Sequence, residues 1–422
     1  MASKWYKWAV VAMLWLVCFF NYADRQSIFS VFPLLKQEPG MKLTDVQLGF
    51  VASAFMWVYA GAGWLAGMVG DRFRRKTVVL AGFIFWSLIT LAFGFATRYW
   101  HLVTLRAVEG FGEAFYFPAA MALVSSYHGK DTRSRAMGIH QSSVYAGTVA
   151  GGTLGGVMGE YFGWRSSFFL LGGLGIAFGL VLWAFLKEPP PASAMADSDE
   201  RSSDAQRESV TSLFRNMVGL FRIPMVLVLT AVFVGANFVA VVFLVWLPKF
   251  LFDKFHMSLS MAGFSATAFL QVASVLGVLS GGMLADRLAR RYRGGRMITQ
   301  ALGLFGGVAF VFMVGWTLHV PVLIVAMTGF GFFKGLYDSN IWASLHDVVP
   351  PERRATAVGA VNSISWLGAG VATVSIAAAS QRLGMSACIS ATSLIYLFFG
   401  LLLIWGVSRF MRGKPWPMTT AR

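Results

Sequence analysis

The sequence has little charge for its length and almost no cysteine. Only 13% of its 422 residues are charged and 57% are hydrophobic, whereas a soluble domain averages about 25% charged residues. This composition excludes an ordinary soluble enzyme and indicates that the lipid bilayer is the solvent. The two cysteines, Cys18 and Cys388, both lie in apolar runs, which argues against a disulfide framework or a cysteine-based metal site.

Common enzyme motifs are also missing. The sequence contains neither the Gly-x-x-x-x-Gly-Lys-Ser/Thr loop that cradles nucleotide phosphates nor the His-Glu-x-x-His pair that binds zinc. We therefore expect no enzymatic activity, no catalytic residue, no bound metal and no cofactor.

Long apolar runs are what the sequence has in abundance. Twelve of them are long enough to form membrane-spanning helices, and the first lacks the cleavage site of a signal peptide. Their approximate limits are 8–34, 46–70, 77–97, 100–127, 134–160, 166–186, 222–248, 259–285, 297–317, 320–346, 354–380 and 386–408. The predicted fold class is an all-α membrane protein with twelve transmembrane helices.

Basic residues outnumber acidic ones by 35 to 19, which gives a net charge of +16. Such an excess first suggests an acidic partner such as nucleic acid. If the amino terminus is cytoplasmic, however, the predicted inner segments hold 25 of the bases and the outer segments seven. By the positive-inside rule both termini then face the cytoplasm. We expect a multi-pass protein of the inner (plasma) membrane, monomeric, in contact with membrane lipid and with no nucleic-acid partner.

One polar stretch divides the chain. Residues 188–212 contain three consecutive prolines and an acidic, serine-rich run, a composition that cannot support a packed core. They separate residues 1–187 from residues 213–422, and each part holds six predicted spans. The two parts repeat one another, because Asp71-Arg72 after the second span matches Asp286-Arg287 after the eighth. The sequence predicts two pseudo-symmetric six-helix bundles joined by a cytoplasmic linker.

Several motifs resemble the major facilitator superfamily over essentially the whole chain. The loop Gly70–Lys76 and the segment Arg106–Gly110 are typical of the superfamily. Within it, Asn21–Arg25, Gly112–Ala119 and Gly163–Arg165 are similar to the anion:cation symporters. That resemblance implies uptake of sugar acids or other organic anions together with protons, by rocking of the two bundles about a midplane site.

Two alternatives stay open. The Spinster group shares the Asn-Tyr-Ala-Asp-Arg and Gly-Glu-Ala sequences, which leaves a Spinster-like transporter of lipids or amphiphiles. The glycine-rich fifth span lacks the Gly-Pro pair of drug:proton antiporters, which counts against drug efflux without excluding it.

Seven charged residues remain inside the predicted spans, namely Asp24, Arg25, Arg106, Glu109, Glu113, Lys334 and Asp338. On a lenient insertion scale each costs about 2.5–3.5 kcal/mol when unpaired, or roughly 20 kcal/mol together. That sum exceeds the stability of a typical domain. These charges must therefore be paired, neutralised by protonation or hydrated by water in a polar cavity.

We expect Asp24 and Glu113 to carry protons, with Glu109 as a third candidate. A poorly hydrated carboxylate beside an arginine can bind or release a proton as substrate arrives, and the resemblance implies such roles for acids in these two segments. Arg25 is expected to anchor the substrate carboxylate through two parallel hydrogen bonds, with Lys334 as its counterpart in the second half.

A purely structural reading of the charges is also possible. In it, Asp24 with Arg25 and Arg106 with Glu109 form closed pairs that only orient helices. Polar and aromatic residues expected to bind the substrate are Tyr59, Tyr116, Gln141, Tyr145, Asn237, Asn340 and Asn362. Residues expected to act in gating are Asp71, Arg72, Arg106, Arg135, Asp286 and Asp338. The sequence as a whole predicts a proton-coupled symporter of a small organic anion.

Overall fold

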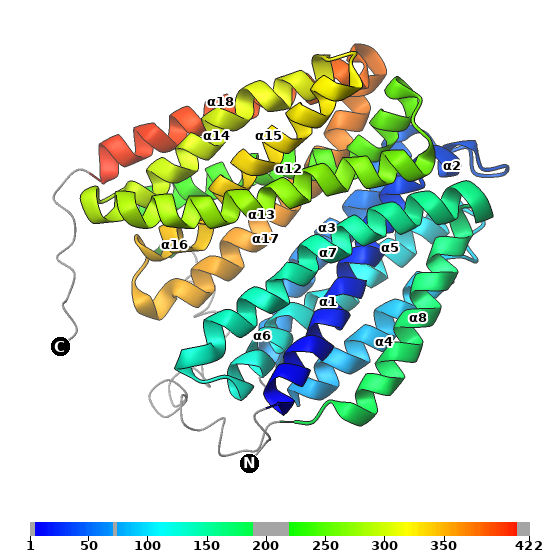
Figure 1. Ribbon diagram of the computed structural model, residues 1–422, viewed down its shortest axis with the longest axis horizontal. Coiled ribbons are helices and arrows are strands. Elements are labelled where there is room, and N and C mark those ends of the chain that lie inside the picture. The colour runs from blue at the N-terminus through cyan, green and yellow to red at the C-terminus, as the bar shows by residue number, and fades with distance from the viewer. Residues whose placement is uncertain (1–4, 71–73, 189–218, 412–422) are drawn as a thin grey trace. The chain divides into compact units, whose positions relative to one another are not determined.

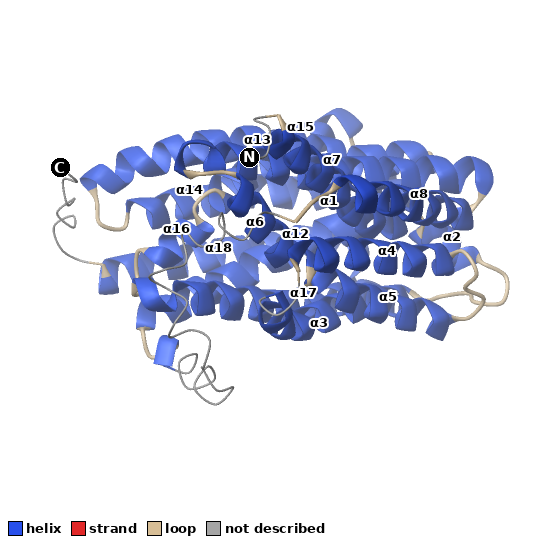
Figure 2. Cartoon of the chain, turned by 90° about the horizontal axis from the view of Figure 1, so that it is seen from below, coloured by secondary structure: helices blue, strands red, loops and turns tan. Residues whose placement is uncertain are grey.

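The structure is a computed structural model that describes residues 5–70, 74–188 and 219–411. All regular secondary structure in these three ranges is helical, and Figures 1 and 2 show helices joined by loops. The helices are α1 Tyr6–Ser30, α2 Phe32–Gln37, α3 Asp45–Gly70, α4 Arg75–Phe93, α5 Tyr99–Ala114, α6 Tyr116–Tyr127, α7 Lys130–Phe162, α8 Trp164–Phe185, α12 Pro224–Phe255, α13 Leu259–Arg291, α14 Gly295–Trp316, α15 Val320–Asp338, α16 Ile341–His346, α17 Arg354–Leu383 and α18 Met385–Phe410, with a 3₁₀ turn at Pro351–Arg353.

Ten helical segments in the described part of the chain are long and apolar enough to cross a membrane. The predicted span 100–127 falls instead on two shorter helices, α5 and α6, which break at Phe115. Pro118 explains the break, because its ring cannot accommodate the carbonyl four residues earlier, at Ala114, where α5 ends. The predicted span 134–160 lies within α7, which is continuous and rich in glycine. The chain is thus an all-helical, multi-pass membrane protein.

The chain divides into two compact units. Unit 1 consists of Met1–Ser209 and Leu244–Thr267, and unit 2 of Val210–Phe243 and Ala268–Arg422. The predicted division at the linker 188–212 stays a prediction, since residues 189–218 lie outside the described ranges.

Within unit 1, α1 packs closely along α7. A Cβ atom added at Gly147, Gly151 or Gly155 of α7 would strike the backbone of α1, at Phe19, Ala23 and Ser27 respectively. The spacing of four residues on both helices places all these contacts on one face of each, and only glycine permits so close an approach. The contact fixes α1 from one side and leaves Asp24 and Arg25 to face α3, α4 and α5.

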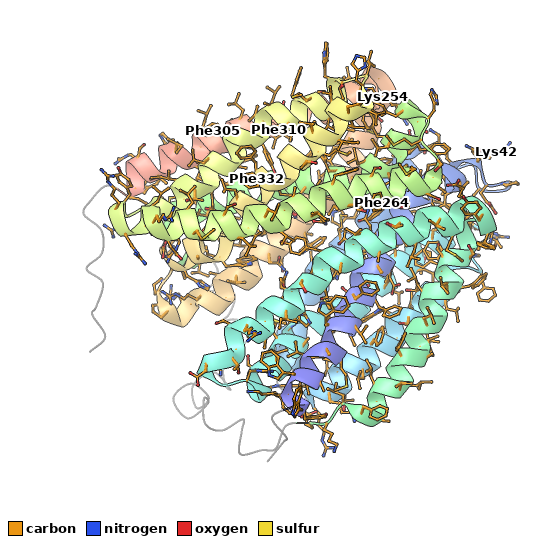
Figure 3. All side chains as sticks on the ribbon, in the orientation of Figure 1. Lys42, Lys254, Phe264, Phe305, Phe310 and Phe332 are labelled. Atoms are coloured by element: carbon orange, nitrogen blue, oxygen red, sulfur yellow. The ribbon has the colours of Figure 1, made fainter. Side chains whose placement is uncertain are left out.

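Phenylalanines fill the helix interfaces of unit 2. The ring of Phe310 on α14 stacks on Phe333 of α15 with 5.7 Å between centroids, and Phe305 of α14 lies against Gly400 of α18. Figure 3 labels Phe305 and Phe310 along α14. Glycine opposite a large ring lets two helices interlock without a polar contact.

Candidate functional site

The charged residues predicted within the first half come together in unit 1. All five are buried, with at most 9% of each residue exposed to solvent. They are Asp24 and Arg25 on α1, and Arg106, Glu109 and Glu113 on α5. We refer to these five residues as the charge cluster.

An ion pair between α1 and α5 forms the centre of the cluster. The Nε–H group of Arg25 donates to Oε2 of Glu113. The side chain of Glu113 has no exposed surface and that of Arg25 is 11% exposed. Because this pair joins two helices far apart in the sequence, it places a cation and an acid at one point in the interior of unit 1.

Aromatic rings surround the Arg25 guanidinium. Its Cζ atom lies 4.9 Å from the ring centre of Tyr22, 4.7 Å from that of Phe55 and 4.8 Å from that of Tyr59. A guanidinium at such distances is attracted by the negative faces of the rings, the more so where water is excluded. The aromatic frame therefore holds the cation in place independently of Glu113.

The second arginine forms a closed pair on its own helix. Nη1 of Arg106 lies 2.8 Å from Oε2 of Glu109, three residues further along α5. Its guanidinium also lies 4.6 Å from the ring centre of Phe55, so that one ring contacts both arginines of the cluster. The expected pair of Arg106 and Glu109 is thus present, while its role, structural or functional, stays a prediction.

Asp24 is arranged differently. The hydroxyl of Thr90 on α4 donates to its Oδ2 at 3.3 Å, and its Oδ1 is buried without a hydrogen-bond partner among the described residues. Glu109, Glu113 and Arg106 all lie within electrostatic range. Asp24 does not pair with Arg25, because neighbouring residues on a helix point about 100° apart.

Sequence reasoning missed Thr90 and Phe55. Phe55 had a detectable signal, since it stands four residues before Tyr59 and so shares its helix face, and the two rings stack with 5.7 Å between centroids. Thr90 had none, because a single threonine in an apolar run is more often bonded to its own helix. Thr90 does bond to Trp86 O at 3.0 Å as well as to Asp24.

The other predicted substrate residues of unit 1 have varied surroundings. Tyr116 is buried, and its hydroxyl donates to Leu14 O at 2.8 Å while lying 2.9 Å from Nε2 of His140. Gln141 is exposed and Tyr145 is half-buried. Tyr59 contacts Arg25 of the cluster, and the substrate roles of Tyr59, Tyr116, Gln141 and Tyr145 stay predictions.

In unit 2, Lys334 forms an ion pair with Asp338, one turn along α15. Asn237 donates to Ser365 O at 3.3 Å, Asn340 donates to Gly281 O at 3.3 Å, and Asn362 is half-buried. The Lys334–Asp338 pair satisfies both charges locally. Whether any of these side chains touches a substrate stays a prediction.

Two of the other predicted gating residues lie within the described ranges, Arg135 on α7 and Asp286 on α13. Asp71 and Arg72 fall outside the described residues, so their gating roles stay predictions. Arg135 is exposed, and its guanidinium lies 5.7 Å from the ring centre of Trp8. Asp286 is also exposed and lines a cavity in unit 2.

Buried ion pairs in a multi-pass membrane protein indicate a transporter, because charges within membrane proteins mark ion and substrate pathways. Comparison with known proteins gives the family. The sequence profile of the Major Facilitator Superfamily matches residues 14–373, and the chain belongs to that superfamily. The predicted membership is confirmed.

The relatives are transporters rather than enzymes. A probable sulfoacetate transporter of Cupriavidus necator is 28% identical over 368 residues, covering 84% of this chain and 83% of that protein. A probable galactarate/D-glucarate transporter of Escherichia coli is 27% identical over 390 residues, covering 87% and 85%. The prediction that this chain is a transporter and not an enzyme agrees with both.

A solved structure shares the fold. The crystal structure of a bacterial homologue of the human lysosomal transporter Spinster, in an inward-facing and unoccupied conformation, matches with a TM-score of 0.82. The match covers 99% of this chain and 100% of that one at 20% identity. This likeness shows the major facilitator fold.

Proposed function

We propose that this protein is a proton-coupled symporter that carries a small organic anion, a sugar acid or related carboxylate, by alternating access. The proposal includes twelve transmembrane helices in two six-helix bundles, both termini in the cytoplasm, a monomer in the inner (plasma) membrane, and the proton as the coupling ion. The names of the two bacterial relatives support the anionic substrate class. The distribution of basic residues along the sequence supports the orientation.

The observation that carries the proposal is the buried pair of Arg25 and Glu113. A substrate carboxylate is the same chemical group as the Glu113 side chain, so the two compete for one guanidinium. When the substrate displaces Glu113, the freed carboxylate is left in a site with no exposed surface. An unpaired buried carboxylate is costly unless it takes up a proton. Anion binding at Arg25 is therefore coupled to protonation of Glu113.

The charge count of the cluster supports the same coupling. Two arginines face three acids, so the fully ionised cluster carries one excess negative charge. One proton balances that excess, and Asp24 can hold it because no cation among the described residues is bonded to it. An arriving anion adds a further negative charge, and a second proton, on Glu113, balances it.

Transport assays in proteoliposomes test this proposal. With an inward proton gradient we expect galactarate, glucarate or sulfoacetate to drive acidification of the lumen. Arg25→Ala should abolish anion binding. Glu113→Gln should preserve exchange of labelled for unlabelled anion but stop uphill uptake, because the side chain can no longer take up a proton.

Asp131→Asn is the matched control, since it neutralises an exposed carboxylate at the start of α7, outside the cluster. It should transport like the unaltered protein. Uphill uptake by Glu113→Gln would contradict the coupling role. No anion-dependent proton flux, together with binding of a lysophospholipid, would favour a Spinster-like transporter, and proton efflux driven by a lipophilic drug would favour antiport.

A further inference from the structure

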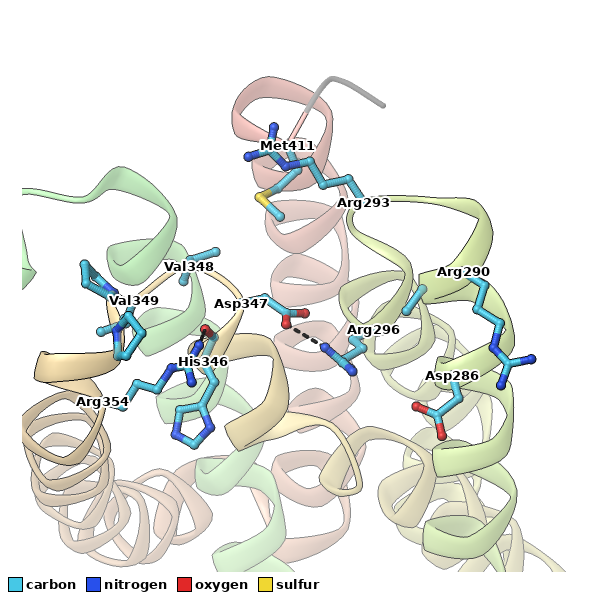
Figure 4. A pocket seen from close by; sticks show the side chains of 13 residues that line it. Asp286, Arg290, Arg293, Arg296, His346, Asp347, Val348, Val349, Arg354 and Met411 are labelled. Carbon is cyan, nitrogen blue, oxygen red and sulfur yellow. Dashed lines mark hydrogen bonds and ion pairs between the residues drawn. The ribbon is translucent and has the colours of Figure 1, made fainter. Parts of the chain in front are cut away.

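A cavity of about 870 Å³ opens at one end of unit 2. Its walls come from the end of α13, the turn before α14, the end of α16 with the loop that follows, the start of α17 and the end of α18 (Figure 4). The charged residues that line it are Asp286, Arg290, Arg293, Arg296, Asp347 and Arg354. Four guanidinium groups face two carboxylates, so the lining carries a surplus of two positive charges.

Contacts within the cavity leave this surplus in place. Arg296 binds Asp347 with 2.5 Å between Nη1 and Oδ1, and Arg354 donates to the backbone oxygen of His346 at 3.1 Å. Within the described part of the chain, Arg354 thus uses one of the five donors of a guanidinium, on a neutral acceptor. Arg290 is exposed and forms no ion pair within the described residues. Two cations of the wall are consequently available to an anion.

Backbone charge adds to the field of the side chains. Helix α14 begins at Gly295, between the lining residues Arg293 and Arg296. The amino end of a helix carries about half a unit of positive charge. The same end of the cavity is therefore positive from both side chains and backbone.

Apart from His346, the rest of the lining is apolar. It consists of Ala289, Val348, Val349, Pro350, Pro351 and Met411. Large exposed rings adjoin the wall at Tyr292 and Phe410, next to Arg293 and Met411 in the sequence. The cavity is thus suited to a ligand that combines anionic groups with a less polar part, and its volume falls within the usual range for small-molecule sites.

We propose that this cavity binds the phosphate groups of an anionic ligand, and that their source is the headgroup of an anionic phospholipid. Guanidinium groups bind phosphate oxygens through paired hydrogen bonds. Basic pockets between the ends of membrane helices bind such headgroups, and a headgroup brings glycerol and acyl carbons beside its phosphate. This inference does not depend on the transported substrate, because the charge cluster lies in unit 1.

Native mass spectrometry of the purified full-length protein tests the proposal. The probes are phosphatidylglycerol and cardiolipin, phosphatidylcholine as the zwitterionic comparison, and inorganic pyrophosphate as the soluble phosphate. We expect Arg290→Gln with Arg354→Gln to weaken binding of the anionic lipids on the order of 10- to 30-fold. Arg290→Glu alone, at an exposed residue, gives the same direction of change without disturbing the bond to His346.

Arg382→Gln is the matched control, because Arg382 lies in the last turn of the same helix as Arg354, about 40 Å away along the axis. It should bind lipid like the unaltered protein. Displacement of lipid by pyrophosphate would confirm a shared phosphate site, and binding of pyrophosphate without lipid would assign the cavity to a free phosphate compound. Equal lipid binding by the unaltered protein and both cavity variants, or equal binding of phosphatidylcholine and the anionic lipids, would overturn the proposal.

Discussion

The buried pair of Arg25 and Glu113 makes a quantitative prediction about stability. With 11% and 0% of the two side chains exposed, either charge left alone stays in a site with little water. Removing one partner of a buried pair costs about 3–5 kcal/mol, whereas replacing both by apolar side chains leaves no lone charge and costs far less. We therefore expect Glu113→Leu and Arg25→Met each to lower the free energy of unfolding by about 3–5 kcal/mol.

The double variant should be more stable than either single variant. It loses the contacts of the guanidinium with three aromatic rings, each of which contributes about 0.5–2 kcal/mol, but it buries no unpaired charge. The coupling energy from the double-mutant cycle should then be at least as large as the cost of either single substitution, about 3–5 kcal/mol, which is at or above the upper end for residues in contact. Reversible unfolding in mixed micelles, followed by circular dichroism during titration with dodecyl sulfate, measures all four proteins.

Lys334 and Asp338 provide the comparison. They also form an ion pair, but their side chains are 15% and 26% exposed, so the same cycle should give a coupling below about 1 kcal/mol. If the costs of Arg25→Met and Glu113→Leu add within about 0.5 kcal/mol, the two charges do not stabilise one another. The competition between substrate and Glu113 would then have no energetic basis.

Two further predictions concern packing and pH. Gly263→Val should destabilise the protein by about 1–3 kcal/mol, because its Cβ would strike the backbone oxygen of Gly152, whereas Gly173→Ala, in open space, should be neutral in the same thermal melt. Burial lowers the pKa of His128, in the loop after α6, below its ordinary value of 6.5. The unfolded chain therefore binds a proton at His128 more readily than the folded protein, and the melting temperature should fall as the pH drops through about 6.5. In His128→Asn this fall should be smaller. An identical pH profile of the melting temperature in the variant would contradict the prediction.

Much of the helical fold could be predicted from the apolar runs, because a backbone in lipid must satisfy its hydrogen bonds within a helix. The break between α5 and α6 was less accessible, although Pro118 was its signal. Mostly apolar residues continue on both sides of the proline, so a hydropathy average over many residues does not detect it. The geometry at a single residue determines such a helix break, and an average over many residues hides the signal of that residue.

The members of the charge cluster could be predicted, but not all of their pairing. Helical spacing was sufficient for Arg106 and Glu109, three residues apart on one helix. The partner of Arg25 was not determined by spacing, because Glu113 lies on another helix and the choice between acids of similar depth depends on how α1 is rotated. That rotation is set by the glycine contacts between α1 and α7, which involve no charge at all.

Asp24 distinguishes a transport role for the cluster from a purely structural one. Glu109 and Glu113 each bind an arginine, as acids that only orient helices would, whereas Asp24 is bonded to the hydroxyl of Thr90 among the described residues. Asp24→Asn should therefore cost less than about 1 kcal/mol, while Glu109→Gln, which weakens a charged hydrogen bond, should cost about 1.5–3 kcal/mol.

Transport should show the reverse order. Asp24→Asn keeps the acceptor for Thr90 but cannot exchange a proton, so uphill anion uptake should stop although the protein remains folded. If Asp24→Asn is as destabilised as Glu109→Gln and still concentrates the anion, Asp24 serves the fold alone. An acid that can be neutralised at little cost to stability, yet is needed for uphill transport, is what proton coupling requires of a buried carboxylate.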